Sequence, residues 1–395
     1  MGRLYNYELK KLIKNKLTLL TMGIMVLIVI GWGVFSAFAG ASNEIDGDRP
    51  SRYTFNLMRR EESKKIEGCS IDDTILSQMN HYLPGSVDTE DFLQYYDIHE
   101  FVGFTIDTMS DVQISKTTAT ELYDILHEKL NIKHLTDEGY SETEQAYWAE
   151  QAENILSDSI VYNGYFEGWR QITNMIKVLI YLVVLFIAVC LSTIFTYENT
   201  RKTDQLIFAS RYGKCRLYWA KISAGITVSV SFALLLIALF VGVVAIVFGL
   251  DGFNTMLQFV LMRPFDLSIG QAALILFGLL IVAALLTAVF VMIVSFLTQN
   301  SIATISVVAG MLMLSLFVSE VPGNIRWLSE LWYLIPSNLV NLNGSFRYSL
   351  LSVGDFQFVS YQYAFFAYVL LSAVIILAGR WAYGKYQIKA RSIWL

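Results

Sequence analysis

Long apolar runs separated by polar segments dominate the pattern of this chain of 395 residues. A helix needs about 20 apolar residues to cross the hydrocarbon layer of a bilayer. Segments that approach or exceed this length are residues 17–39, 173–196, 220–249, 269–297, 302–319 and 361–380. The pattern therefore predicts an all-α polytopic membrane protein with six transmembrane helices, of which residues 220–319 would contain the third to fifth.

The first apolar run follows a basic start and ends in Ala37-Phe38-Ala39, which resembles a signal-peptidase site. The run is longer than the roughly 7–15 residues of a signal-peptide core, so we expect it to be retained as an anchor. Residues 1–16 combine apolar positions at helical spacing with lysines, which predicts a cytoplasmic helix at the membrane interface. A basic flank that only orients the first span is an equal alternative.

Residues 40–172 are long enough to fold as a domain, and they carry several helix signals. The spacing of a capping box, which starts a helix, occurs at Ser70/Asp73, Thr118/Glu121 and Ser141/Glu144. An apolar stripe at helical spacing follows at Leu122, Ile125, Leu126 and Leu130. Aromatic residues that fit a membrane-interface belt precede the second span at Tyr162, Tyr165, Phe166 and Trp169. We expect a mainly helical extracellular domain here.

Residues 320–360 form too long a segment for a simple hairpin between two spans. One helical face would be shared by Leu328, Leu331, Trp332 and Ile335. Pro336 would end that helix, because proline cannot continue a helical hydrogen-bond ladder. We expect two short apolar helices on the extracellular side that re-enter the membrane or lie on it.

Composition and charge predict the orientation. The chain is 55% hydrophobic and 16% charged, which is typical of a polytopic membrane protein. Basic residues gather in residues 1–16, 197–221 and 381–395. These segments lie on one side of a six-span arrangement, and basic loops mark the cytoplasmic side. Residues 40–172, with 26 acidic and 10 basic residues, then lie outside. We expect a plasma-membrane protein with both termini in the cytoplasm.

Motifs for nucleotide binding are absent: the chain has neither a GxxxxGK[ST] phosphate loop nor a dinucleotide fingerprint. The spans carry no carboxylate, histidine or arginine near their centres, which argues against a proton-coupled carrier and an intramembrane protease. We therefore expect no enzyme activity and no cofactor in this chain, and nothing indicates a nucleic-acid partner.

Histidine and cysteine positions indicate no metal site and no disulfide. His127 and His134 lie seven positions apart near acidic residues, but solvated surface histidines are the simpler interpretation. Cys69, Cys190 and Cys215 fall in three different parts of the predicted topology, so none has an obvious partner.

A dense charged island, residues 197–219, separates the second and third spans. Residues 203–210 have the pattern of a short helix with apolar Leu206 and Ile207. An exposed amphipathic helix of this kind can dock in a groove of another protein. A loop that only fixes the topology is the alternative, and the residues alone favour neither.

The order of residues in this island resembles the loop between spans two and three of ABC-2-type transporter permeases. The residues that carry the resemblance are Phe195, Glu198, Thr203, Leu206, Ser210, Arg211 and Lys221. Residues 7–14 also resemble the N-terminal interfacial helix of that family, and residues 334–337 its proline-bearing segment before the last span. Residues 199–203 replace the usual Gly-Thr of the loop, which leaves the start of its helix open.

The resemblance implies a permease that exports a hydrophobic or amphipathic substrate, such as a peptide, an antibiotic or a lipid-like molecule. The implied partners are cytosolic ABC ATPase subunits that carry ATP and Mg, a second permease protomer that is identical or related, and membrane lipid. The loop would be the coupling helix, and the residues expected to couple it to the ATPase are Glu198, Arg201, Asp204, Leu206, Arg211 and Lys221. The alternative is a membrane sensor or mechanotransmitter whose extracellular domain binds a ligand such as an antimicrobial peptide.

Overall fold

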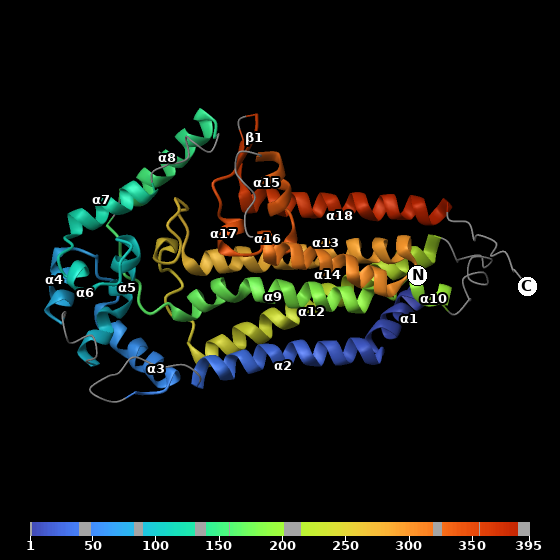
Figure 1. Cartoon of the computed structure of the whole chain (residues 1–395), viewed down its shortest axis with the longest axis horizontal. Helices are drawn as coiled ribbons and strands as arrows, with labels where there is room; N and C mark the ends of the chain where they lie inside the picture. Colours follow the sequence, from blue (N-terminus) through green and yellow to red (C-terminus); the bar gives the residue numbers. More distant parts are fainter. Residues whose placement is uncertain are drawn as a thin grey trace, which may run out of the picture.

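The chain folds into a bundle of long helices that carries a smaller helical domain at one end (Figure 1). The computed structural model describes residues 2–38, 49–82, 90–130, 140–157, 159–200, 215–318, 326–354 and 356–385. These residues are mostly helical, in agreement with the apolar pattern.

Several helices are long and apolar enough to cross a membrane, and this indicates a membrane protein. Among the described residues there are five: α2 (Lys16–Phe38), α9 (Glu167–Leu191), α12 (Cys215–Val247), α13 (Ile269–Thr298) and α18 (Ser360–Lys385). They run along the long axis of the molecule (Figure 1). The remaining predicted span is α14 (Ser301–Phe317), which has 17 residues and is shorter than the others.

Helices α9 and α13 form the centre of the bundle. In their most apolar stretches 72% and 56% of the residues are buried within the chain, against 22–28% in α2, α12 and α18. α9 packs against α2, α12, α13 and α14, and its Phe186 stacks on Phe232 of α12 with ring centroids 3.6 Å apart. A helix that is apolar all round is stable in such a central position. The peripheral helices leave apolar side chains such as Leu27 and Leu370 exposed, which suits contact with lipid.

The segments between α2 and α9 form the helical domain at the left of Figure 1. Its elements are α3 (Arg52–Ser63), η1 (Lys64–Ile66), α4 (Asp73–His81), η2 (Glu90–Tyr95), α5 (Tyr96–Thr105), α6 (Asp111–Ile114), α7 (Ala119–Leu130) and α8 (Glu142–Leu156). We refer to it as the end domain.

The capping signals in the end domain are correct at two of three places. Ser141 and Glu144 form the expected capping box of α8, and the Glu121 backbone N–H donates to Thr118 Oγ1 at 3.3 Å at the start of α7. The prediction for Ser70 is wrong, because α4 begins two residues later. Asp72 caps α4 by accepting from the backbone N–H groups of the next turn.

The core of the end domain includes the connection between α12 and α13, which the apolar pattern did not predict. Phe259, in η4 (Leu257–Phe259), stacks on Phe101 of α5 with ring centroids 4.3 Å apart. Phe265 packs edge-on against Trp148 of α8. The expected interfacial belt before α9 is also corrected, because its side chains are buried in the chain: Tyr162, Tyr165, Phe166 and Trp169.

The segment before α18 combines short helices with a strand pair. It contains α15 (Arg326–Tyr333), α16 (Pro336–Leu339), α17 (Leu342–Ser345), β1 (Leu350–Val353) and β2 (Phe356–Val359). β1 and β2 pair antiparallel, so the all-helical prediction is wrong at this place. Pro336 begins α16 instead of ending α15, because its missing N–H costs nothing in the first turn of a helix.

Candidate functional site: a buried charge cluster

Two of the six residues expected to couple the loop lie within the described part of the chain. Glu198 lies in α10 (Thr196–Thr200), just beyond α9, and Lys221 lies in the second turn of α12. The other expected residues fall outside the described residues: Arg201, Asp204, Leu206 and Arg211. The structure therefore describes the two ends of the loop, where it joins α9 and α12.

Glu198 and Lys221 form a buried ion pair. Lys221 Nζ donates to both carboxylate oxygens of Glu198, at 2.8 Å and 2.7 Å. The Lys221 side chain is 1% exposed and that of Glu198 is 14% exposed. A buried ammonium group is strongly unfavourable unless a partner compensates its charge. The pair therefore holds α10 against the start of α12.

The turn that follows α9 explains why a hydrogen-bond donor is needed at position 221. Residues 192–195 form a turn between α9 and α10, and a turn of this kind leaves backbone carbonyls without helical partners. Lys221 donates to the Ile194 carbonyl, and Ser295 of α13 donates to the Ser192 carbonyl at 2.7 Å. Donors from two neighbouring helices thus complete the hydrogen bonds of this turn.

The N-terminal helix α1 (Gly2–Ile13) supplies the other half of the site. Lys11 Nζ donates to Glu198 Oε1 at 2.7 Å. Glu8 is 3% exposed, and its Oε2 lies 3.7 Å from Lys11 Nζ and 4.0 Å from Lys221 Nζ. Two acids and two bases thus balance in one place. We call Glu8, Lys11, Glu198 and Lys221 the loop-end cluster.

Sequence reasoning missed Glu8 and Lys11. It placed the apolar side of residues 1–16 toward lipid, but α1 packs against α12 and buries Leu12 together with Glu8. Tyr5 strengthens this contact by donating to Thr227 Oγ1 of α12 at 3.1 Å. The available signal was that Glu8, the one acid among residues 1–16, lies one helical turn before Leu12 and so on the same face.

A polar cavity of about 280 Å³ adjoins the loop-end cluster and is lined in part by Glu8, Lys11, Lys14 and Asn15. Within the described part of the chain, Glu8 Oε2 accepts no hydrogen bond. The cavity is polar and large enough for several water molecules. Water there would complete the hydrogen bonding of Glu8 and would let the cluster rearrange without creating a dry void.

The opposite end of α9 is held by a second set of buried charges. Arg59 of α3 forms ion pairs with Asp97 of α5 and, at 3.5 Å, with Glu167 in the first turn of α9. Arg170 bonds the same Glu167 and also reaches Glu100 of α5 at 2.7 Å. We call these five residues the domain-end network. They connect the end domain directly to α9.

Neighbouring acids keep Arg59 ionised despite its burial. Burial alone lowers the pKa of Arg59, but Asp97, Glu100 and Glu167 together outweigh it and raise that pKa well above its usual value. Burial, followed by the charge of Asp97, raises the pKa of Tyr162 well above its usual value. Tyr162 therefore stays protonated and donates to Asp97 Oδ2 at 2.5 Å.

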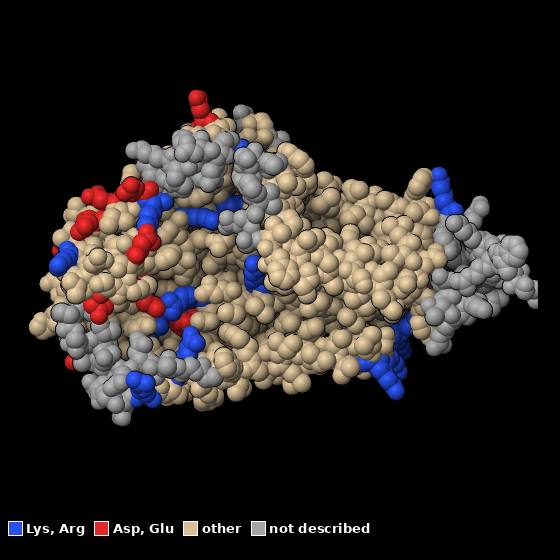
Figure 2. Space-filling model, in the orientation of Figure 1, with Lys and Arg blue, Asp and Glu red and all other residues tan. Residues whose placement is uncertain are grey.

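Charged side chains on the surface also lie toward the two ends of the molecule (Figure 2). In this view, side chains of both signs gather on the end domain and basic side chains gather at the α1 end of the bundle. A broad uncharged band lies between them, as expected of a surface in contact with hydrocarbon. In the described ranges, no group of three or more His, Cys, Asp or Glu residues could hold a metal ion.

Comparison with known proteins gives no relative: no family model, no curated protein and no solved structure matches this chain. Its function is therefore inferred from its own residues and their geometry.

Proposed function

We propose that this chain is the permease subunit of an ATP-driven exporter of the ABC-2 type. It would cross the plasma membrane six times, with α14 as the fifth span, both termini in the cytoplasm and the end domain outside. Two protomers, identical or related, would work with separate ATPase subunits that bind ATP and Mg. The substrate would be hydrophobic or amphipathic, because the long helices carry no Asp, Glu, His or Arg near their centres.

The single observation that carries this proposal is the loop-end cluster. It joins three segments: α1, α10 and the start of α12. Residues 201–214 connect the last two, so a partner that displaces this loop pulls on a point where three helices are held by buried charges. Buried ion pairs are costly to separate. The helices would therefore move together instead of letting the loop shift alone.

Helix α9 offers a path for such a movement across the bundle. The helical stretch Glu167–Glu198 has 32 residues, and at 1.5 Å per residue it extends over roughly 47 Å. Glu198 belongs to the loop-end cluster and Glu167 to the domain-end network. Residues 192–195 form a turn within this stretch, but Lys221 and Ser295 hold its carbonyls. A shift at the loop-end cluster would thus reach the end domain through α9. Rigid-element movements of this type are a common form of conformational switching.

The experiment that tests the proposal measures two things separately: attachment of the ATPase to this chain, and transmission of the ATPase movement to the transmembrane helices. Affinity capture of the full chain from its native membrane should bring down an ATP-binding protein. Arg211→Glu, in the loop, should weaken the capture, because this residue would contact the ATPase. Glu198→Gln should leave the capture intact but uncouple ATP turnover from transport, because this residue would pass the movement on.

Lys116→Glu serves as the control, because this exposed lysine lies between α6 and α7, at the opposite end of the molecule from α10 (Figure 1). It should change neither capture nor ATP turnover. If no ATP-binding protein is captured, or if capture and ATP turnover are the same in wild type, Arg211→Glu and Glu198→Gln, the exporter proposal is wrong.

The domain-end network favours a second candidate, a membrane sensor or mechanotransmitter. Its end domain would bind a ligand and move α9 through Glu167 and Arg170. The net charge of −16 in residues 40–172, from 10 basic and 26 acidic residues, favours a cationic ligand. ATP-dependent uptake of labelled hydrophobic peptides into inverted vesicles distinguishes the two, since a sensor would show none.

A further inference from the structure

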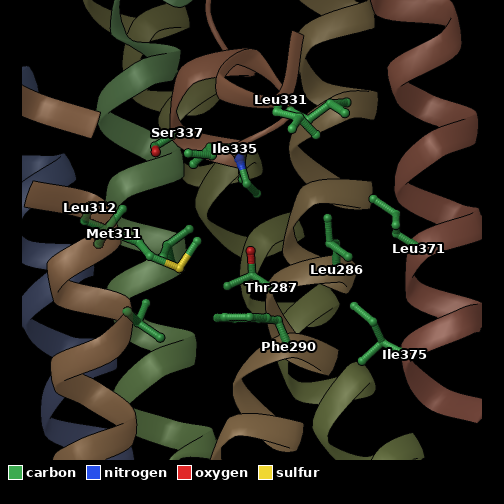
Figure 3. A pocket seen from close by; sticks show the side chains of 14 residues that line it. Leu286, Thr287, Phe290, Met311, Leu312, Leu331, Ile335, Ser337, Leu371 and Ile375 are labelled. Atoms are coloured by element: carbon green, nitrogen blue, oxygen red, sulfur yellow. The ribbon is translucent and has the colours of Figure 1, made fainter. Parts of the chain in front are cut away.

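An apolar cavity of about 230 Å³ lies inside the bundle between α13, α14 and α18, next to α15 and α16. In Figure 3, Met311 of α14 lies on one side, and Leu371 and Ile375 of α18 lie on the opposite side. Ile335 approaches from the side of α16, and Phe290 of α13 lies across from it. The cavity is thus bounded by two consecutive helices, α13 and α14, and by α18 from near the end of the chain.

Polar groups contribute little to the cavity wall. Among the described residues that line it, none is charged, and only Thr287 and Ser337 are polar. Ser337 already donates to Ser315 Oγ at 2.7 Å, and Ser315 donates to Asn338 Oδ1 at 2.5 Å. A polar ligand would lose its hydration here and gain almost no partner in return. The wall therefore selects hydrocarbon.

The cavity opens toward the side of the bundle. Leu331 and Leu371 line it and are 56% and 41% exposed, so its mouth lies between α15 and α18. Beside the mouth, α18 presents other exposed apolar side chains, including Leu370 and Val374. The mouth therefore faces a surface that suits the bilayer interior and not water.

The size of the cavity limits what can enter. Its volume is below the range of about 300–1,000 Å³ that drug-sized ligands occupy. It corresponds to about eight water molecules at liquid density. The cavity can therefore hold a part of a larger molecule, and a linear chain that enters from the side and leaves its polar end outside fits this shape.

We propose that the cavity binds one acyl chain of a membrane phospholipid, with the headgroup outside, beside α15. A void leaves the surrounding side chains without dispersion contacts, and an acyl chain restores them without breaking any hydrogen bond. Phospholipid chains are the medium at this surface, so they are present at the mouth at all times. The bound chain lies between α14 and α18 and bridges them. Binding needs no ATPase, so this inference stands apart from the exporter proposal.

Photolabelling tests the inference. The purified full chain is reconstituted in phosphatidylcholine vesicles that contain a phosphatidylcholine with a diazirine in the middle of one acyl chain. Mass spectrometry should find the label on cavity residues of α13, α14 and α18. Met311→Trp and Ile375→Trp fill the cavity from opposite walls. Each should reduce this labelling about tenfold, which corresponds to losing the burial of roughly two methylene groups.

Leu314→Trp is the matched control, because Leu314 lies on α14 two residues after the cavity residue Leu312 but is exposed and does not line the cavity. It should leave the cavity labelling unchanged. Thr287→Val keeps the side-chain shape and removes the hydroxyl, so a hydrocarbon ligand should label this variant as strongly as wild type. If one tryptophan variant fails to fold, as judged by size-exclusion chromatography, the other carries the test.

Several results would overturn the inference. One is cavity labelling that persists in the folded tryptophan variants. Another is weaker labelling in Thr287→Val, which would reveal a ligand anchored through a polar group. A third is labelling by a diazirine-bearing hydrophobic peptide but not by the phospholipid, which would assign the cavity to a transported substrate instead.

Discussion

Glu198 and Lys221 are separated by 23 positions in the chain, yet Lys221 Nζ lies 2.7 Å from Glu198 Oε2 in a buried ion pair. The pair brings together the two ends of the connection between α9 and α12. Because Lys11 and Glu8 of α1 join it, the pair belongs to a cluster in which each charge balances the others. This property makes the cluster sensitive to single substitutions.

The first prediction concerns that balance. Lys221→Met and Glu198→Gln should each lower the free energy of unfolding by about 3–5 kcal/mol, because each leaves an uncompensated buried charge. The double variant should be less destabilised than the sum of the two, because Glu8 and Lys11 remain as a balanced pair. Denaturant unfolding in detergent, followed by tryptophan fluorescence, gives the coupling energy. Additive effects of the two substitutions would contradict the interpretation.

The sequence predicted the long helices well, for a simple physical reason. A span is defined by local composition, so the apolar runs identify α2, α9, α12, α13 and α18 without knowledge of their neighbours. The capping box at Ser141 succeeded for the same reason, because it depends on residues within one turn. The pairing of Leu350 with Val359 in the strand pair had a local signal in Gly354, whose φ of 62° suits a turn, and this signal was missed.

The candidate site was predicted only in part, because it depends on contacts between distant segments. Glu198 and Lys221 were found through the order of residues around the loop. Glu8 and Arg59 were not found, because a charged residue is normally assigned to the surface, and nothing within α1 or α3 reveals their partners on distant segments, Lys221 and Glu167. Arg59 meets Glu167 across more than a hundred positions. Only the fold brings such residues together.

The second prediction compares two neighbouring arginines. Arg59→Lys should lower the free energy of unfolding of the end domain by about 1–3 kcal/mol, because a single ammonium cannot replace the fork that contacts both Asp97 and Glu167. Arg60→Lys should cost about 0–1 kcal/mol, because its pair with Asp251 is about one-third exposed. Limited proteolysis of the end domain measures both. Equal protease sensitivity of the two variants would argue against the domain-end network as a special contact.

The third prediction concerns pH. Burial raises the pKa of Glu144, but hydrogen bonds from Arg326 and Ser141 outweigh it and hold the pKa below its ordinary value of 4.5. The folded-state pKa is thus depressed, so the contact stabilises the fold above pH 4.5 and is lost as the pH falls through the lower folded-state value. The protection of α8 and α15 against hydrogen exchange, relative to the intrinsic rate at each pH, should therefore decrease at pH values below the ordinary pKa.

Glu144→Gln is the control for this effect, because it cannot titrate. Its protection against exchange in α8 and α15 should already be reduced at neutral pH and should change little on acidification. A wild-type exchange pattern in the glutamine variant at neutral pH would show that the Arg326 contact does not hold these helices together.

The fourth prediction uses two glycines of α2. A Cβ added at Gly33 would lie 2.1 Å from Val243 Cγ1 of α12, whereas one added at Gly31 would meet nothing within 4 Å. Gly33→Ala should therefore destabilise the α2–α12 contact by about 1–3 kcal/mol through overpacking. Gly31→Ala should be neutral or stabilising by up to about 1 kcal/mol, because alanine favours the helix. Thermal unfolding in detergent measures both, and a reversed order would contradict this packing.

The last prediction separates structural from surface lysines on α1. Lys11 bonds Glu198, whereas its neighbour Lys10 is exposed on another face of the helix. Lys11→Gln should release α1 from α10 and raise hydrogen exchange throughout α1, while Lys10→Gln should leave exchange unchanged. In the complete exporter that we propose, Lys11→Gln should also reduce transport per ATP hydrolysed, because α1 would no longer move with α9. If Lys11→Gln speeds hydrogen exchange in α1 but leaves transport unaltered, the Lys11–Glu198 ion pair is a structural contact only. In that case α1 does not transmit the movement.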